Sequence, residues 1–291
     1  MAFNRILIAN RGEIAIRLAR AIADCEATSV AVYAEDDAQS LHVRSADQAI
    51  ALQGQGVAAY LDAAQLIRIA KEQNCDAIHP GYGFLSENAD FARACEQAGI
   101  TFIGPAPEVL DTFGDKASAR RLALQQGVPL TQGTNEPTTL EQARDFMQSL
   151  GDGAAVMLKA LAGGGGRGMR AVHDLAELDD AFARCSSEAT AAFGRGDLYV
   201  ERLIRRARHI EVQIIGDGND VAHVWERDCT LQRRNQKLLE VAPAPSLDPA
   251  MRKQLHEAAC TLTRAVGYRG LCTVEFLLDE ERGDFVFMEA N

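Results

Sequence analysis

The sequence predicts a Rossmann-like α/β lobe over residues 1–114, followed by α+β structure up to residue 291. Short apolar runs alternate with helix-like segments in the first third, as in a parallel sheet covered by helices. A run of glycines lies between two strand-like runs near the middle of the chain. Period-two alternation then dominates the last third and predicts antiparallel strands.

The first lobe is built from five predicted strands and three longer helices. The strand-like runs are "RILIAN", "TSVAVYA", "DQAIAL", "CDAIHP" and "ITFIG". Helical apolar spacing occurs between them in "GEIAIRLARAIADC", "LDAAQLIRIAKEQN" and "ENADFARACEQAG". Ligands gather at the carboxyl ends of strands in such a sheet. The turn "HPGYGFLSEN", which contains Tyr82, follows one of these strands and either shapes a pocket or is a well-packed turn.

Three further segments follow the first lobe. A helix in "KASARRLALQQGV" is predicted to connect the lobes over residues 115–130. Residues 131–203 are predicted to form a small α+β lobe in which the glycines join two strands as a hairpin. Residues 204–291 contain strands in "HIEVQII", "VAHVWERD", "GLCTVEFLLD" and "DFVFMEAN", with one helix near "PAMRKQLHEAACTLTRAVG". Because the chain stops directly after an apolar strand, we expect this last domain to be incomplete at Asn291.

The composition argues against several classes of function. A net charge of −11 disfavours nonspecific binding to nucleic acid or to an anionic membrane, so an anionic substrate must meet local Lys and Arg. No apolar run approaches the ~18–20 residues of a membrane span. Seven cysteines without a CxxC pair fit a reducing cytoplasm better than a disulfide framework. The histidines show no HxxxH pattern, which disfavours a zinc site.

The glycine run in "KALAGGGGRGMRAV" is the first candidate site. Without Cβ atoms, consecutive backbone amides can approach phosphate oxygens closely. Lys159 would add a fixed positive charge, whereas neither the P-loop nor the dinucleotide pattern fits. A flexible linker is the alternative, but the flanking strands, Arg167 and Arg170 favour phosphate binding. The candidate residues are Gly163, Gly164, Gly165 and Gly166.

Two charged stretches are the next candidates. In "YVERLI", backbone groups could read the edge of an adenine, and Glu201 could accept from its exocyclic amine; a strand with solvated charges is the alternative. The stretch "ERDCTLQRRNQK" concentrates four cations in an otherwise acidic chain, and arginine suits carboxylate, bicarbonate and phosphate. From charge alone a solvated surface is the more common outcome for such a cluster. The cations are Arg227, Arg233, Arg234 and Lys237, with Gln232 and Asn235 between them.

Two glutamates on neighbouring apolar strands are the third candidate. Glu275 in "TVEFLLD" and Glu289 in "FMEAN", with Asn291 on the same face, would form an oxygen cluster suited to Mg²⁺. Buried carboxylates without a cation would be costly, and the alternative of two surface glutamates is disfavoured by their apolar neighbours. Together with the glycine run and the cations, this cluster indicates phosphoryl transfer from ATP.

These stretches also resemble a known family. The segments "ILIANRGEIAIRLARA", "HPGYGFLSEN", "KALAGGGGRGMR", "RHIEVQIIGDG", "ERDCTLQRRNQK", "GLCTVEF" and "FMEAN" are similar to those of biotin carboxylases, which belong to the ATP-grasp superfamily. The resemblance implies a pre-ATP-grasp domain, an ATP-grasp lid over residues 131–203 and a central domain that is incomplete here. It also implies that ATP phosphorylates bicarbonate to carboxyphosphate, whose carboxyl group passes to biotin on a carrier protein.

The resemblance implies a role for each matching residue. Lys116 and Lys159 would hold the ATP phosphates under the glycine lid, and Glu201, Arg202 and Ile204 would lie beside adenine. The remaining implied contacts are His209 and Gln232 with the nucleotide, Lys237 with bicarbonate, Tyr82 near biotin, and Glu275, Glu289 and Asn291 with Mg²⁺ or Mn²⁺. His209 and Lys237 are the implied catalytic residues. A carboxyltransferase component and a homodimer are also implied.

Two departures from the family pattern keep alternatives open. Asn235 stands where the family usually has histidine, so a contact near the ribose would change. The arginine and glutamate that follow "EAN" in the family are absent, so we expect a fragment whose substrate side is incomplete. The alternatives are another ATP-grasp ligase, such as a carbamoyl-phosphate or amino-acid ligase, and a nucleotide-binding fragment without activity. The stretches "HPGYGFLSEN" and "QRRNQK" favour biotin carboxylase.

Overall fold

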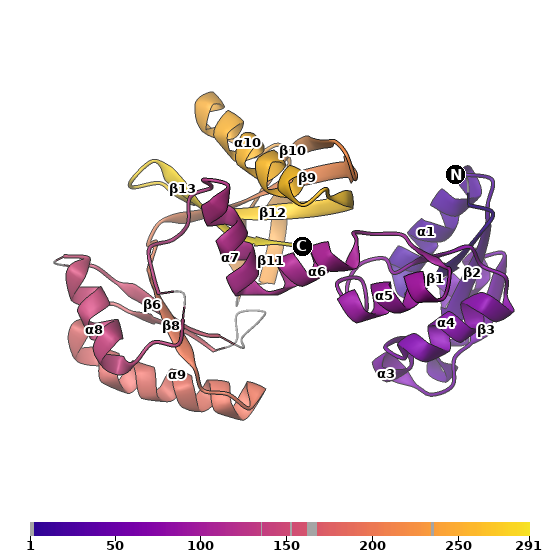
Figure 1. The fold of residues 1–291 in the computed structure, drawn as a ribbon, viewed down its shortest axis with the longest axis horizontal. Coiled ribbons are helices and arrows are strands. Elements are labelled where there is room, and N and C mark those ends of the chain that lie inside the picture. The colour runs from indigo at the N-terminus through magenta and orange to yellow at the C-terminus, as the bar shows by residue number, and fades with distance from the viewer. Residues whose placement is uncertain (1–2, 135, 152, 162–167, 234–235) are drawn as a thin grey trace.

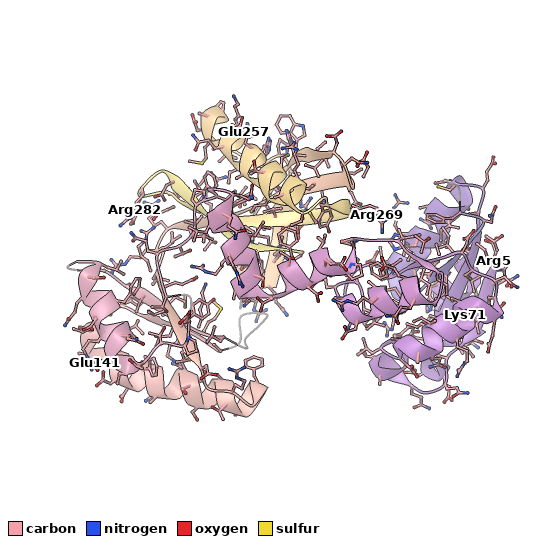
Figure 2. All side chains as sticks on the ribbon, in the orientation of Figure 1. Arg5, Lys71, Glu141, Glu257, Arg269 and Arg282 are labelled. Carbon is pink, nitrogen blue, oxygen red and sulfur yellow. The ribbon has the colours of Figure 1, made fainter. Side chains whose placement is uncertain are left out.

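Three β-sheets follow one another along the described part of the chain (Figure 1). The structure is a computed structural model that describes residues 3–134, 136–151, 153–161, 168–233 and 236–291. The first sheet is parallel and the other two are antiparallel, which confirms the predicted α/β lobe followed by α+β structure. Charged side chains such as Lys71 and Glu141 lie on the outer surfaces of the helices (Figure 2).

The first sheet has the strand order β3-β2-β1-β4-β5. Its strands are β1 (Arg5–Ile8), β2 (Thr28–Tyr33), β3 (Gln48–Ala51), β4 (Ala77–His79) and β5 (Thr101–Phe102). Its helices are α1 (Gly12–Asp24), α2 (Leu41–Ser45), α3 (Gly56–Tyr60), α4 (Ala63–Glu72) and α5 (Ala89–Gln97), with a 3₁₀ turn at Glu35–Asp37. The short α2 and α3 were not predicted, because five residues are too few to show helical spacing.

The strand order reverses between β1 and β4, and the loops after these two strands meet there. The Asn10 side-chain amide donates to the carbonyl oxygens of Pro80 at 2.7 Å and Tyr82 at 2.8 Å. A reversal of this kind opens a crevice at the carboxyl ends of the strands. The loop that carries Tyr82 is therefore held at the point where the strand order reverses.

Two helices join the first lobe to the rest of the chain (Figure 1). They are α6 (Pro107–Gly114) and α7 (Lys116–Gln125). The first was not predicted; Pro107 occupies its first turn, where proline's missing N–H costs nothing. Asp115 caps the second by accepting from the Ser118 amide at 2.7 Å.

The lobe predicted over residues 131–203, called the lid below, contains a three-stranded antiparallel sheet of order β7-β6-β8 and two helices. Its elements are α8 (Leu140–Ser149), β6 (Val156–Ala160), β7 (Met169–Val172), α9 (Leu178–Phe193) and β8 (Leu198–Arg202), with a 3₁₀ turn at Leu175–Glu177. β6 and β7 pair as the predicted hairpin. The glycines Gly163 to Gly166, which join these strands, lie outside the described residues.

The last sheet is antiparallel, in the order β11-β10-β9-β12-β13. Its elements are β9 (Ala207–Asp217), β10 (Val221–Arg233), β11 (Gln236–Val241), α10 (Pro249–Ala265), β12 (Arg269–Asp279) and β13 (Asp284–Ala290). Because β10 and β11 form a hairpin, the basic stretch lies on two paired strands. Within the parts of the chain that are described, no helix has both the length and the apolar character of a membrane crossing.

One face of this sheet is covered by α10. Ile210, Val212 and Ile214 alternate along β9 and share a core with Leu255 and Leu262 of the helix. Residues on the opposite face of β9 must then be the ones between them, because successive side chains of a strand point to opposite faces. The face away from α10 is therefore the polar one.

Truncating this core should cost more than truncating an exposed leucine. Leu255 is fully buried, so Leu255→Ala should lower the free energy of unfolding by about 2–4 kcal/mol through lost burial and a cavity. Leu124, which is 69% exposed on α7, is the matched control and should change it by less than about 0.5 kcal/mol on Leu124→Ala. Urea unfolding measures both, and equal losses would contradict the assignment of the core.

Candidate active site

A row of three glutamates crosses the polar face of the last sheet. Glu275 of β12 lies opposite Glu211 of β9 on one side and opposite Glu289 of β13 on the other. Glu211 and Glu275 are only 2% and 4% exposed. Buried carboxylates need hydrogen bonds and counter-charges, so the partners of this row define the site.

Two cations hold the first two carboxylates. Arg227 of β10 donates from Nε to Glu211 Oε1 at 2.5 Å, and from Nη1 to Gln213 at 3.0 Å. Lys237 of β11 donates from Nζ to Glu211 and, at 3.2 Å, to Glu275 Oε1. Burial alone would lower the pKa of Lys237, but the hydrogen bond to Glu211 and the charges of both glutamates outweigh burial and raise it. Lys237 is therefore a fixed cation and not a general base.

His209 is oriented from both of its ring nitrogens. Nε2 lies 2.5 Å from Glu275 Oε2, and the Gln232 amide nitrogen lies 2.7 Å from Nδ1. The same amide nitrogen donates to the carbonyl of Cys229 at 2.9 Å, which identifies it as the NH₂ end. His209 therefore accepts at Nδ1 and donates from Nε2 to Glu275.

The pKa values of Glu275 and Glu289 are shifted in opposite directions. Burial would raise the pKa of Glu275, but the hydrogen bonds from His209 and Lys237 and the positive charge of Lys237 lower it overall. Burial and the neighbouring charge of Glu275 raise the pKa of Glu289, against smaller opposing effects of Lys116 and Lys159. The Glu289 carboxylate has no hydrogen bond or ion pair with any residue within the described ranges. A bound cation would supply the charge that Glu289 lacks.

The donor set at this end of the row suits a hard divalent cation. Asn291 donates from Nδ2 to Glu275 Oε1 at 2.8 Å, which holds its side chain beside Glu275. His209, Glu211 and Glu275 also place one donor atom each within 4.8 Å of one another. However, Arg227 and Lys237 already neutralise Glu211, whereas Glu289 has no such partner. Oxygen donors from Glu275, Glu289 and Asn291 are the better fit for Mg²⁺.

A second buried carboxylate lies in the lid. Glu201 of β8 accepts from Arg120 Nη1 of α7 at 2.7 Å and from Lys159 of β6. Arg120 also donates to the carbonyl of Thr131 at 3.2 Å. Both Glu201 oxygens thus hold cations, so the predicted contact with an adenine amine would need to come from its backbone and not its carboxylate.

The segment after β8 is anchored in a way that favours backbone recognition. Arg202 donates from both terminal nitrogens to Asp279 Oδ2 at 3.2 Å, which ties the lid to the end of β12. Its amide donates to Gln132 at 2.9 Å, and the Leu203 amide donates to Ala155 at 2.8 Å. Ile204 is buried. The chain between lid and sheet therefore has a defined path.

Some predicted site residues lie away from the glutamate row, and others lie outside the residues that the structure describes. Tyr82 is 62% exposed in the first lobe, and its hydroxyl donates to Glu13. Asn235 and Arg234 lie outside the described residues, as do the glycines of the lid. Arg233 is exposed, so the solvated-surface alternative applies to it but not to Arg227 or Lys237.

Two residues of the site, Glu211 and Arg120, were not predicted from the sequence. Glu211 was visible in principle, because His209, Glu211 and Gln213 are polar at period two in an otherwise apolar strand. Arg120 gave no local signal, since its partner Glu201 is 81 residues away. Only tertiary structure brings that pair together.

The sequence also matches known protein families and proteins. Residues 2–110 match the family described as biotin carboxylase, N-terminal domain. Residues 115–291 match the family described as carbamoyl-phosphate synthase L chain, ATP binding domain. Pyruvate carboxylase 1 of Caenorhabditis elegans is 51% identical over 99% of this chain, and pyruvate carboxylase of Bacillus subtilis is 50% identical over 100%. The chain spans about a quarter of the length of these curated relatives.

Solved structures show the same fold. The biotin carboxylase domain of a single-chain bacterial carboxylase is 56% identical, with a TM-score of 0.85 over 99% of this chain and 61% of that one. The Campylobacter jejuni biotin carboxylase in complex with a β,γ-ATP ligand is 44% identical, with a TM-score of 0.92 over 99% and 65%. The biotin carboxylase domain dimer of Hydrogenobacter thermophilus 2-oxoglutarate carboxylase, with MgADP, ADP and bicarbonate, is 42% identical, with a TM-score of 0.91 over 100% and 64%.

Removing the unpartnered charge should stabilise the metal-free protein. Because the folded-state pKa of Glu289 is raised, its ionisation costs folding free energy, and stability is lost as pH rises through that pKa. At neutral pH, Glu289→Gln should raise the free energy of unfolding by about 0.5–2 kcal/mol. The gain should shrink in acid, where Glu289 is protonated.

Urea unfolding without metal at neutral and acidic pH measures this difference. Glu188→Gln, on the exposed surface of α9, is the matched control and should show no such pH-dependent gain. Destabilisation by Glu289→Gln at neutral pH would contradict the unpartnered charge.

Proposed function

Because the chain belongs to the biotin carboxylase family, we propose that it carries out the ATP-dependent carboxylation of biotin within a biotin-dependent carboxylase. The observation that carries the proposal is the meeting of two groups of residues. Lys116 and Lys159 act electrostatically on Glu289, which lies beside Glu275 at the end of the glutamate row. In this proposal the cations that bind phosphate would lie near the carboxylates that bind the metal, as transfer of a phosphoryl group requires.

ATP would be held between the lid and the last sheet. In this proposal Lys116, Lys159 and the glycines 163–166 bind the phosphates, while backbone groups near Glu201, Arg202 and Ile204 bind adenine. His209, Gln232 and Asn235 line the nucleotide. The geometric support is that Lys159 and Glu201 are paired across adjacent strands and that the path after Arg202 is fixed.

A divalent cation, Mg²⁺ or Mn²⁺, would be held by Glu275, Glu289 and Asn291. When bound, it would neutralise the negative charge of the ATP phosphates. The protein's own part is to keep Glu275 ionised through His209 and Lys237, and to keep a second carboxylate available at Glu289.

Bicarbonate would be positioned by Lys237. A bicarbonate oxygen attacks the γ-phosphorus of ATP, the bond to ADP breaks, and carboxyphosphate forms. Its carboxyl group then passes to a ureido nitrogen of biotin, the proton of that nitrogen moves to the departing phosphate, and phosphate leaves. Since Glu211 and Glu275 hold Lys237 as a cation, it binds the anion and orients it without accepting a proton. Tyr82, at the crevice of the first lobe, would approach biotin.

The partners follow from the same proposal. A biotin carrier protein or domain would deliver biotin, a carboxyltransferase component would consume carboxybiotin, and two chains would form a homodimer. We place the protein in the cytoplasm, where its seven unpaired cysteines would stay reduced. The acceptor, an acyl-CoA, pyruvate or another, is a property of the parent enzyme.

Bicarbonate dependence tests the proposal. MgATP binding is measured by calorimetry on this chain, and ADP release is measured on the full natural polypeptide that contains it, with and without bicarbonate and biotin. The expected results are MgATP binding and ADP release that requires bicarbonate. ATP turnover that requires glutamine, ammonia or an amino acid instead would overturn it in favour of another ligase. MgATP binding without turnover under any of these conditions would favour a nucleotide-binding function.

Lys237 gives a sharper test of the bicarbonate site. In the full polypeptide, Lys237→Gln should raise the KM for bicarbonate at least about tenfold, because it removes a charge-assisted hydrogen bond, with little change in MgATP affinity. Lys71→Gln makes the same change on the exposed face of α4 and should leave both constants unchanged (Figure 2). An unchanged KM for bicarbonate in Lys237→Gln would assign Lys237 a purely structural role between Glu211 and Glu275.

A further inference from the structure

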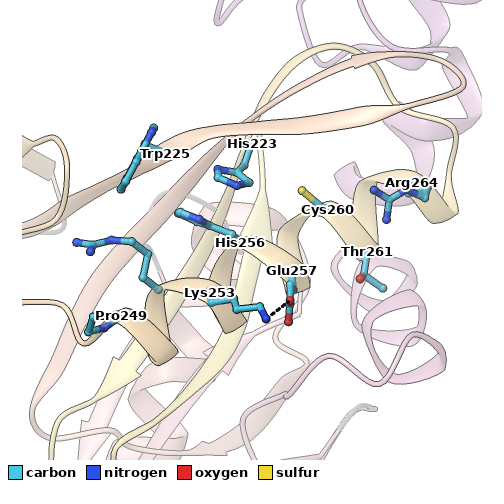
Figure 3. Close-up of a pocket in the computed structure, with 10 residues that line it drawn as sticks. His223, Trp225, Pro249, Lys253, His256, Glu257, Cys260, Thr261 and Arg264 are labelled. Atoms are coloured by element: carbon cyan, nitrogen blue, oxygen red, sulfur yellow. Dashed lines mark ion pairs between the residues drawn. The ribbon is translucent and has the colours of Figure 1, made fainter.

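A hollow of about 520 Å³ lies on the far side of the last sheet, between α10 and the start of β10. Figure 3 shows His223 and Trp225 on the strand and His256, Cys260 and Arg264 along the helix. This is the face that α10 covers, opposite the glutamate row. The hollow is therefore separate from the candidate active site.

Aromatic rings form one wall of the hollow. The His223 and His256 rings are stacked, with centroids 3.9 Å apart and planes inclined by 26°. Trp225 meets His256 edge-on at 6.0 Å and 85°, and the Arg252 guanidinium lies 5.6 Å from the Trp225 ring centroid. Stacked imidazoles do not aim their in-plane lone pairs at a common point, which disfavours a metal ion here. The wall instead presents flat π surfaces.

Trp225 is held in an unfavourable conformation. Its φ is +70°, a left-handed value that bulky side chains rarely adopt, and it lies in a bulge between His223 and Glu226. The side chain is nevertheless 54% exposed, so packing alone does not explain why it is held there. Backbone outliers of this kind cluster at binding sites.

A buried carboxylate fixes the wall from behind. Glu226, which has no exposed surface, accepts from Arg252 Nε at 2.9 Å and His256 Nε2 at 2.6 Å. It also accepts from the Ala244 amide at 3.1 Å. Arg252 and His256 are thus oriented before any ligand arrives, which lowers the entropic cost of binding.

Positive charge prevails at the rim of the hollow. Lys253 pairs with Glu257 at 3.6 Å, but both side chains are largely exposed, and such pairs are weak. Arg264 makes no side-chain hydrogen bond or ion pair with any residue in the described part of the chain. Because Arg252 is neutralised by Glu226, Arg264 and Lys253 remain as the cations available to a ligand. This occurs in a chain of net charge −11.

We propose that this hollow binds a small planar aromatic anion, a flat ring that carries a carboxylate or a phosphate. The ring would lie against Trp225 and the imidazole pair, and the anionic group would reach Arg264 or Lys253. A volume of about 520 Å³ is within the usual range of small-molecule sites. The inference does not depend on the proposed function, since no residue of the glutamate row lines the hollow.

The chain offers a built-in reporter, because Trp225 is its single tryptophan. Tryptophan emission is followed during titration with benzoate, benzamide, cyclohexanecarboxylate and AMP. Benzoate has both ring and charge, benzamide lacks the charge, and cyclohexanecarboxylate lacks the flat ring. We expect a saturable change with benzoate and a response at least about tenfold weaker with the two analogues. Tighter binding of AMP than of benzoate would identify a nucleotide phosphate as the source of the chemistry.

Variants at the rim complete the test. Arg264→Gln, and Lys253→Gln as a second variant, should weaken benzoate binding, by about tenfold at whichever residue holds the anion. Arg68→Gln makes the same charge change on exposed α4 and should leave binding unchanged. No saturable response to benzoate or AMP, equal affinity for all four compounds, or full affinity in both rim variants would each overturn the proposal.

Discussion

The placement of three carboxylates in one cross-strand row, two of them buried and the third half-buried, is the constraint on which the rest of the site depends. Glu211, Glu275 and Glu289 lie side by side because β9, β12 and β13 pair in this register. The sheet tolerates the first two only because Arg227 and Lys237 reach them from β10 and β11. The hairpin of β10 and β11 is thus required electrostatically, and its loss would leave buried charge without compensation.

Much of the fold could be predicted from periodicity, and the failures share a physical cause. Strands with one apolar face, such as β9 and β12, show alternation that any sequence reading detects. β11 was missed because all six of its residues are exposed, so burial imposes no pattern on "QKLLEV". The pairing of Glu275 with Glu289 was predicted from the family resemblance and from their positions on adjacent apolar strands. The Arg120–Glu201 pair could not be predicted, because Arg120 lies on the connecting helix α7, Glu201 lies on β8, and neither carries a local sequence signal for the contact.

Side chains of β10 point alternately to the two faces of the last sheet, so this strand contributes both to the side covered by α10 and to the side of the glutamate row. On β10, Glu226 faces α10 and pairs with His256, whereas the next residue, Arg227, faces the glutamate row. The bulge at Trp225 sets the phase of this alternation, since it adds a residue before Glu226. One strand therefore fixes the back of the sheet and the front at the same time.

The two cations on Glu201 give Lys159 a resting position that it can leave at low cost. When an anionic ligand draws Lys159 away, Arg120 remains on the carboxylate, so no buried charge is left without a counter-ion. Lys159 then exchanges one negative partner, the Glu201 carboxylate, for another, the anionic ligand. In the proposed binding of a nucleotide, a phosphate would thus replace the Glu201 carboxylate as the partner of the Lys159 ammonium group, while Arg120 would keep that carboxylate neutralised.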